Sequence, residues 1–283
     1  MDSFFTPHYV GSSFFDLLQQ SRPELLPQAQ LKLDGMRPAE TPELAEPAHG
    51  TTILALKYGD GVIIAGDRQA TEGFQVSSRR IEKVFKADDH SAIAIAGVAG
   101  PCLEMAKLFE VELAHYEKLE GTPLSLEGKA NKLSQMVKAN LPLAIQGLVV
   151  IPIFVGYDLR KGEGRIFKYD LTGGRYEETD YYATGSGGRE ARSAMKKLFR
   201  DRMAEADGIA LALEALIDAA EEDVGTAGPD FVRGIFPTVK LVVTAGLRDV
   251  SEDRIRQDCQ AIVDRRKRVL PRIDARAQGE AGE

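Results

Sequence analysis

Apolar residues from position 51 onward fall in short runs separated by turn residues, and these runs predict β-strands. TTILALKY (51–58) and GVIIAGD (61–67) meet at Gly59-Asp60-Gly61, which is a hairpin signal. RIEKVF, starting at Arg80, and SAIAIAGVAG (91–100) predict two more strands. The chain after position 50 therefore begins as a sheet.

Two stretches with helical periodicity follow. Apolar residues recur at three- and four-residue spacing in 101–121, where Pro101 suits the first turn of a helix. A second helix is predicted over 124–146, with Ser125 as its N-cap. The same criteria then predict strands at 148–158, 164–171 and 175–185, helices at 188–203 and 209–223, and a closing strand at 238–247.

The order of these elements indicates the fold class. Pairs of helices grouped between blocks of antiparallel strands favour an α+β fold, a four-layer αββα sandwich of two antiparallel sheets flanked by helix pairs. Residues 1–50 differ in texture, because they carry scattered aromatic residues and then a run rich in Pro and Glu. We expect 1–50 to be an appendage and 51–283 to be one domain, with a helical or polar tail from about position 250.

Composition narrows the class of protein. The 283 residues are 43% hydrophobic and 28% charged, as in soluble globular proteins, and the net charge of −7 argues against a nucleic-acid binder. Cys102 and Cys259 lie far apart, so neither a disulfide framework nor a zinc ribbon is indicated, and a reducing cytoplasm is the simplest compartment. The most apolar stretch, 141–157, is too short and too interrupted to span a membrane, and the amino terminus lacks the pattern of a secretory signal.

Several kinds of chemistry are excluded by motif. The four histidines are scattered, with no HExxH and no metal-ligand spacing, and no GxSxG sequence is present. ATGSGGRE (183–190) lacks the GK[ST] of a phosphate loop, and Glu190 stands where a dinucleotide fingerprint needs glycine. This segment is interpreted as a tight turn into a helix, and no metal or cofactor is expected.

The junction Gly50-Thr51-Thr52 is either a loop that leads into a strand or a cleavage site that releases Thr51 as a new amino terminus. A threonine hydroxyl is a poor nucleophile without a base, and a free α-amine with a pKa of about 7.7–8.0 can be that base. While Gly50 is attached, the nitrogen of Thr51 is an amide and cannot act as the base. Cleavage at this bond would create nucleophile and base together, and Gly50 has no side chain to obstruct attack on its carbonyl.

Four motifs in order give the chain a specific resemblance. TTILALKYGDGVIIAGDRQAT, RIEKVF, IAGVAG and ATGSGG resemble the β-subunits of actinobacterial 20S proteasomes, in the precursor form that carries a propeptide. Such proteins are N-terminal nucleophile hydrolases, and the likeness runs from Thr51 to about Leu247. It implies cleavage between Gly50 and Thr51 and a nucleophile at Thr51.

The resemblance also implies roles for other residues. Lys83 would act beside the threonine, Asp67 would hold that lysine, and the backbone N–H of Gly97 would form the oxyanion hole. Ser186 would assist the threonine amine. Asp223 lies where the family has a supporting aspartate, and Thr226 stands where the family usually has serine.

The same resemblance implies a substrate pocket, lined by Ala70, Ile81, Ile95 and Ala99, with Thr71 pairing to the substrate strand. These side chains carry no charge, which favours an apolar residue before the scissile bond. Without the resemblance, Asp67 reads as a turn residue and the two isoleucines as core.

The leading hypothesis is a threonine endopeptidase that needs no cofactor and degrades unfolded polypeptides. The resemblance implies stacked seven-membered rings with α-subunits and other β-subunits, a ring-shaped ATPase activator and a ubiquitin-like tag. Two alternatives stay open: a simpler bacterial threonine protease of sixfold rings, whose chains are shorter, and an inactive ring subunit, which the presence of Thr51, Asp67 and Lys83 disfavours. The leader would either promote or retard assembly.

Overall fold

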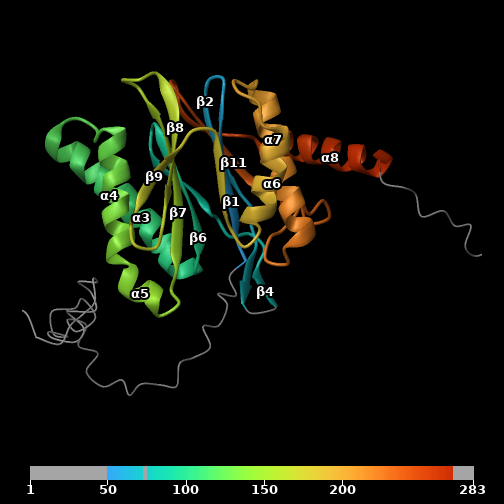
Figure 1. Ribbon diagram of the computed structural model, residues 1–283, viewed down its shortest axis with the longest axis horizontal. Coiled ribbons are helices and arrows are strands. Elements are labelled where there is room, and N and C mark those ends of the chain that lie inside the picture. Colours follow the sequence, from blue (N-terminus) through green and yellow to red (C-terminus); the bar gives the residue numbers. More distant parts are fainter. Residues whose placement is uncertain (1–49, 73–74, 270–283) are drawn as a thin grey trace, which may run out of the picture. The chain divides into compact units, whose positions relative to one another are not determined.

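The computed structural model describes residues 50–72 and 75–269, and in this part of the chain two five-stranded antiparallel sheets form the centre (Figure 1). The first sheet has the order β10-β1-β2-β11-β12. Its strands are β1 (Thr52–Tyr58), β2 (Gly61–Gly66), β10 (Tyr181–Gly185), β11 (Thr238–Val243) and β12 (Gly246–Asp249). The second sheet runs in sequence order, as β5 (Val84–Asp88), β6 (Ser91–Gly97), β7 (Val150–Asp158), β8 (Glu163–Tyr169) and β9 (Arg175–Glu178).

Helices cover the outer face of each sheet. The first sheet packs against α6 (Gly188–Leu198) and α7 (Glu205–Glu222), and the second against α3 (Ala99–Glu120) and α4 (Leu126–Ala139). The short α5 (Leu141–Ile145) follows α4, and α8 (Glu252–Val269) packs on α7. The predicted αββα sandwich is confirmed, and Figure 1 shows the two sheets between the two helical layers.

A core of small and branched side chains fills the space between the sheets. Ile53 and Ile64 of the first sheet belong to one buried cluster with Ala92, Ala94 and Ile153 of the second. Both faces of these strands are covered, which explains why their sequences are almost continuously apolar instead of alternating.

Three predicted strands were wrong in their extent. The closing run 238–247 turns at 244–245 and forms the paired strands β11 and β12. The run 175–185 is not one strand, because it bends at 179–180 and divides into β9 and β10, which belong to different sheets. The strand expected from Arg80 begins only at Val84, and Ile81 donates its backbone N–H to the carbonyl of Arg68 instead of joining the sheet. Lys83 therefore lies just before β5.

Two predicted helices also differ in extent: the run 124–146 divides at Asn140 into α4 and α5, and the run 188–203 ends at Leu198 as α6. Other observations concern polar segments. The hairpin of β3 (Ala70–Glu72) and β4 (Gln75–Ser78) was not predicted. The segment expected to be a helical or polar tail forms α8, whose buried Ile255, Cys259 and Ile262 recur at helical spacing. None of the helices among the described residues combines the length and apolar character needed to cross a membrane. Residues 1–49 of the expected leader 1–50, and the end of the tail, 270–283, lie outside the described residues.

Candidate active site

Thr51 lies at the entrance of β1, against the turn that joins β10 to α6. Ser186 donates its backbone N–H to the carbonyl oxygen of Thr51 at 2.9 Å, which extends the pairing of Thr52 with Gly185. Gly185 has a φ of +101°, and a Cβ there would lie 1.8 Å from the Thr51 oxygen. Only glycine fits this position, so the glycine-rich sequence ATGSGG serves the close approach of the turn to Thr51.

The Gly50–Thr51 peptide bond is buried and surrounded by polar groups. Thr51 is 5% exposed, and its Oγ1 donates to the carbonyl oxygen of Gly50 at 2.8 Å. Lys83 Nζ donates to the same oxygen at 3.4 Å, and the Gly50 N–H donates to Thr71 Oγ1 at 2.7 Å. A hydroxyl and an ammonium group therefore converge on the carbonyl that cleavage would attack.

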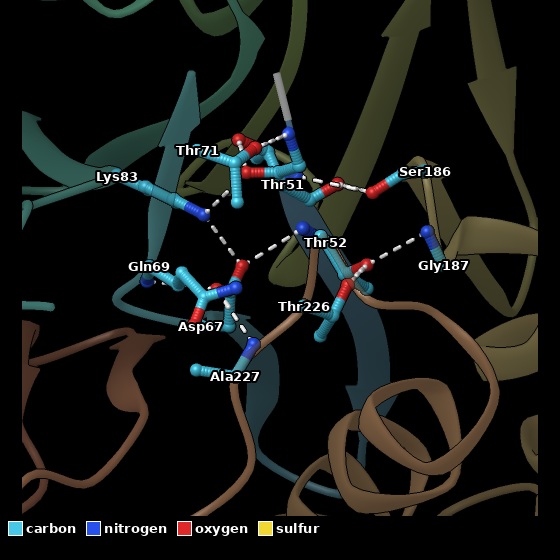
Figure 2. Close-up of polar contacts among 12 residues, drawn as sticks. Thr51, Thr52, Asp67, Gln69, Thr71, Lys83, Ser186, Gly187, Thr226 and Ala227 are labelled. Carbon is cyan, nitrogen blue, oxygen red and sulfur yellow. Dashed lines mark hydrogen bonds and ion pairs between the residues drawn. The ribbon is translucent and has the colours of Figure 1, made fainter. Parts of the chain in front are cut away.

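Lys83 and Asp67 form a buried ion pair beside this bond, and Figure 2 shows the two side chains pointing toward each other. Lys83 Nζ lies 2.6 Å from Asp67 Oδ1, which also accepts the N–H of Thr52 at 2.8 Å. Asp67 Oδ2 accepts the N–H groups of Gln69 at 2.9 Å and Ala227 at 3.2 Å. Burial lowers the pKa of Lys83, and the charge of Asp67 opposes that shift.

A second cluster of polar residues lies on the other side of Thr51. The Thr51 N–H donates to Ser186 Oγ at 3.1 Å, and Ser186 Oγ donates to Asp223 Oδ2 at 2.5 Å. Thr226 Oγ1 donates to the same carboxylate oxygen at 2.5 Å. Ser186 and Asp223 thus meet at the nitrogen of Thr51, and the hydroxyl of Thr226 supports Asp223 in spite of its extra methyl group.

A cavity of about 520 Å³ opens beside the scissile bond. Four of the five predicted pocket residues line this cavity, namely Ala70, Thr71, Ile81 and Ala99. Gly50, Thr51, Lys83 and Gly97 line it as well. Ile95 is not among these lining residues: it is 2% exposed and belongs to the core cluster around Phe109 and Phe154. Lining residues that were not predicted include Ser77, Phe85, Cys102 and Leu103.

Gly97 is held in a conformation that requires glycine. Its φ is +132°, and a Cβ at this position would lie 2.0 Å from the carbonyl oxygen of Val149. The residue ends β6 and borders the cavity that also contains Thr51. This places a rigid backbone segment at the cavity wall, as an oxyanion donor requires.

The sequence did not reveal the residues that hold the charged groups. Thr52, Gln69 and Ala227 make contacts to Asp67, and Gly225 packs directly against Gly50. The doubled threonine after Gly50 was the one signal in the sequence for Thr52. Among the described residues, no group of three or more His, Cys, Asp or Glu side chains is placed to hold a metal ion.

Comparison of the sequence with known proteins places this chain in a family. The sequence profile described as "Proteasome subunit" matches residues 48–231. A "Proteasome subunit beta" from Jonesia denitrificans is 52% identical over 242 residues, covering 86% of this chain and 78% of the relative. Proteins of the same name from Acidimicrobium ferrooxidans and Streptomyces griseus are 50% and 48% identical, over 88% and 93% of this chain and 88% and 91% of the relatives.

Proposed function

The chain belongs to the proteasome subunit family, and we propose that it is the precursor of a β-type threonine endopeptidase whose nucleophile is Thr51. The observation that carries this proposal is the buried Gly50–Thr51 bond, whose carbonyl oxygen accepts from both Thr51 Oγ1 and Lys83 Nζ. In this arrangement the nucleophile, a cationic donor and the bond to be cleaved already lie together.

Processing begins with attack of Thr51 Oγ on the carbonyl carbon of Gly50. The hydroxyl loses its proton, the carbonyl oxygen gains negative charge beside Lys83, and the C–N bond breaks as the Thr51 nitrogen gains a proton. Ser186 Oγ lies 3.1 Å from that nitrogen and holds it in place. Water then hydrolyses the resulting ester, which releases Gly50 as a carboxylate and leaves Thr51 with a free hydroxyl and a free amine.

The mature enzyme would use the same groups on peptides. The Thr51 amine takes the proton of the hydroxyl, which attacks the substrate carbonyl to form an acyl-enzyme, and water hydrolyses this ester in a second step. The positive charge of Lys83 beside Thr51 would favour the unprotonated form of the amine. The N–H of Gly97 would stabilise the oxyanion.

The cavity supports an apolar preference before the scissile bond. Its lining includes Ile81, Ala99, Phe85 and Leu103, which offer aliphatic and aromatic surface to a substrate side chain. Family membership implies assembly into a proteasome core with other subunits. Seven-membered rings, α-subunits, a ring-shaped ATPase, a ubiquitin-like tag and a cytoplasmic location belong to the proposal and rest on the resemblance.

The test is peptide hydrolysis by the assembled particle, purified after coexpression with an α-type partner. We expect cleavage of an N-capped peptide that carries leucine before aminomethylcoumarin, and loss of that activity in Thr51→Ala. A processed wild-type particle without hydrolysis would support an inactive ring subunit instead. The native mass of the particle separates sevenfold from sixfold rings.

A further inference from the structure

Thr52, the residue after the proposed nucleophile, is fully buried and uses both its backbone and its side chain in the site. Its N–H donates to Asp67, as described above, while its Oγ1 points to the opposite side, toward Thr226 (Figure 2). The two hydroxyl oxygens are 2.6 Å apart, and the N–H of Gly187 donates to Thr52 Oγ1 at 3.0 Å. Thr52 therefore connects the two polar groups that flank Thr51.

The hydrogen-bond inventory fixes the direction of this chain. A hydroxyl has one proton, and Thr226 donates its proton to Asp223 at 2.5 Å. The Thr226 hydroxyl must then accept a hydrogen bond from the Thr52 hydroxyl. Thr52 Oγ1 in turn accepts from the N–H of Gly187. The chain runs from Gly187 N–H through Thr52 and Thr226 to Asp223 Oδ2.

The same carboxylate oxygen also receives the bond that leads to the nucleophile. Asp223 Oδ2 accepts from Ser186 Oγ at 2.5 Å, and Ser186 Oγ accepts from the nitrogen of Thr51 at 3.1 Å. Two chains of hydrogen bonds, one from Thr52 and one from Thr51, thus end on a single oxygen atom. A change in the first chain moves or frees the acceptor on which the second depends.

The space around this chain of hydrogen bonds leaves no room for a side chain at Gly187. A Cβ at Gly187 would lie 2.6 Å from Thr52 Oγ1 and 2.9 Å from Thr226 Oγ1, so that any larger residue at this position would displace both hydroxyls. The N–H of Gly187 can reach Thr52 only because no side chain intervenes. The glycine after Ser186 therefore serves the hydroxyl of Thr52.

We propose that Thr52 is a positioning residue for the threonine-protease reaction: its hydroxyl holds Thr226 and, through it, the Asp223 carboxylate that orients Ser186 at the nitrogen of Thr51. This inference rests on the proposed function. Thr52 does not line the cavity, so its hydroxyl affects the rate of the chemical steps and not the binding of substrate.

The experiment compares Thr52→Val, which keeps the shape of the side chain but removes its hydroxyl, with wild type and Thr52→Ser. Activity is expressed as kcat per chain beginning at Thr51, counted by mass spectrometry of the assembled particle. We expect kcat to fall about tenfold in Thr52→Val with KM within about twofold, since one lost hydrogen bond of this kind corresponds to roughly that factor. Thr52→Ser should recover most of the loss. Thr184→Val, on the half-buried β10 strand beside β1, is the matched control and should behave as wild type.

A second variant keeps the test decisive if Thr52→Val does not fold. Thr226→Val interrupts the same chain one bond further on and should lose at least as much kcat. Where both variants fold, the double variant should be no slower than Thr226→Val alone, because the residues act in one chain.

Wild-type kcat in Thr52→Val or Thr226→Val, or additive losses in the double variant, would overturn the role of Thr52 while the proposed function stands. Absence of a Thr51 terminus and of hydrolysis in the wild-type particle would instead overturn the proposed function itself.

Discussion

Gly50→Ala is expected to slow processing because the backbone of Gly225 occupies the space of the new methyl group. A Cβ at Gly50 would lie 2.0 Å from the Cα of Gly225 and 2.2 Å from its carbonyl oxygen. Optimal carbon contacts are about 3.5–4.0 Å, so one of the two backbones must move by about 1.5 Å. The segment that would move carries Asp223, whose bond to Ser186 is 2.5 Å long.

The magnitude follows from that displacement. A misplacement of about 1 Å in a reacting geometry costs roughly 100-fold in rate, whereas overpacking costs only about 1–3 kcal/mol of stability. We therefore expect processing of Gly50→Ala to be slower by about 100-fold while the precursor stays folded. The assay follows loss of the precursor band with time after assembly, with circular dichroism as the check of folding.

Gly228→Ala is the control for this prediction. It makes the same substitution three residues beyond Gly225, where the nearest atom to a new Cβ is a methyl carbon at an ordinary 3.4 Å. Gly228→Ala should be processed at nearly the wild-type rate. Wild-type processing of a folded Gly50→Ala precursor would refute the view that packing against Gly225 sets the position of the scissile bond.

Three further outcomes are expected. Asp67→Asn should lower the free energy of unfolding by about 3–5 kcal/mol in urea titrations, because it leaves Lys83 buried without its counter-charge; a loss below 1 kcal/mol would contradict this. Burial lowers the pKa of Lys83, so kcat/KM should decline with rising pH below the ordinary lysine value of about 10.4 as that group loses its proton. Lys83→Arg should remove this alkaline decline, even though the substitution lowers activity. If the decline is unchanged in Lys83→Arg, the titration belongs to another group. Arg266→Ala should lower the free energy of unfolding by about 1–2 kcal/mol without loss of peptidase activity, since Arg266 forms ion pairs with three carboxylates of α7. Arg268 is exposed, and Arg268→Ala should leave stability unchanged.

The sequence was sufficient for the elements whose apolar pattern is local. The strand β6 follows the predicted run closely, and the helix α4 begins after the predicted N-cap Ser125, since burial on both faces or at helical spacing is visible along the chain. The predicted helix 124–146 nevertheless divides at Asn140 into α4 and α5. Residues 175–185 show the limit, because an alternating run does not reveal that its two halves join different sheets. The hairpin β3–β4 was missed because β4 is exposed along its whole length and has no apolar period.

The tail expected from about position 250, helical or polar, forms α8. Ile255, Cys259 and Ile262 carry a helical period, but strongly polar neighbours mask it, and only the packing of α8 on α7 shows what that face covers.

In the candidate site, too, some residues could be predicted from local motifs and others could not. Thr51, Asp67 and Lys83 were predicted from short motifs whose joint order and spacing are specific, and the structure brings them together around one peptide bond. Contacts made by the segment after α7 depend on residues more than a hundred positions away, and no local pattern predicts them. Ile95 was assigned to the pocket by position alone, and its side chain faces the helix layer.

The most direct test of the account is the amino-terminal sequence of the chain in the assembled, active particle. We predict that it begins at Thr51 with a free amine, and that Thr51→Ala particles retain residues 1–50. An active particle in which the Gly50–Thr51 bond is still intact would contradict the account, since the nitrogen of Thr51 would then be an amide and unable to serve as the base.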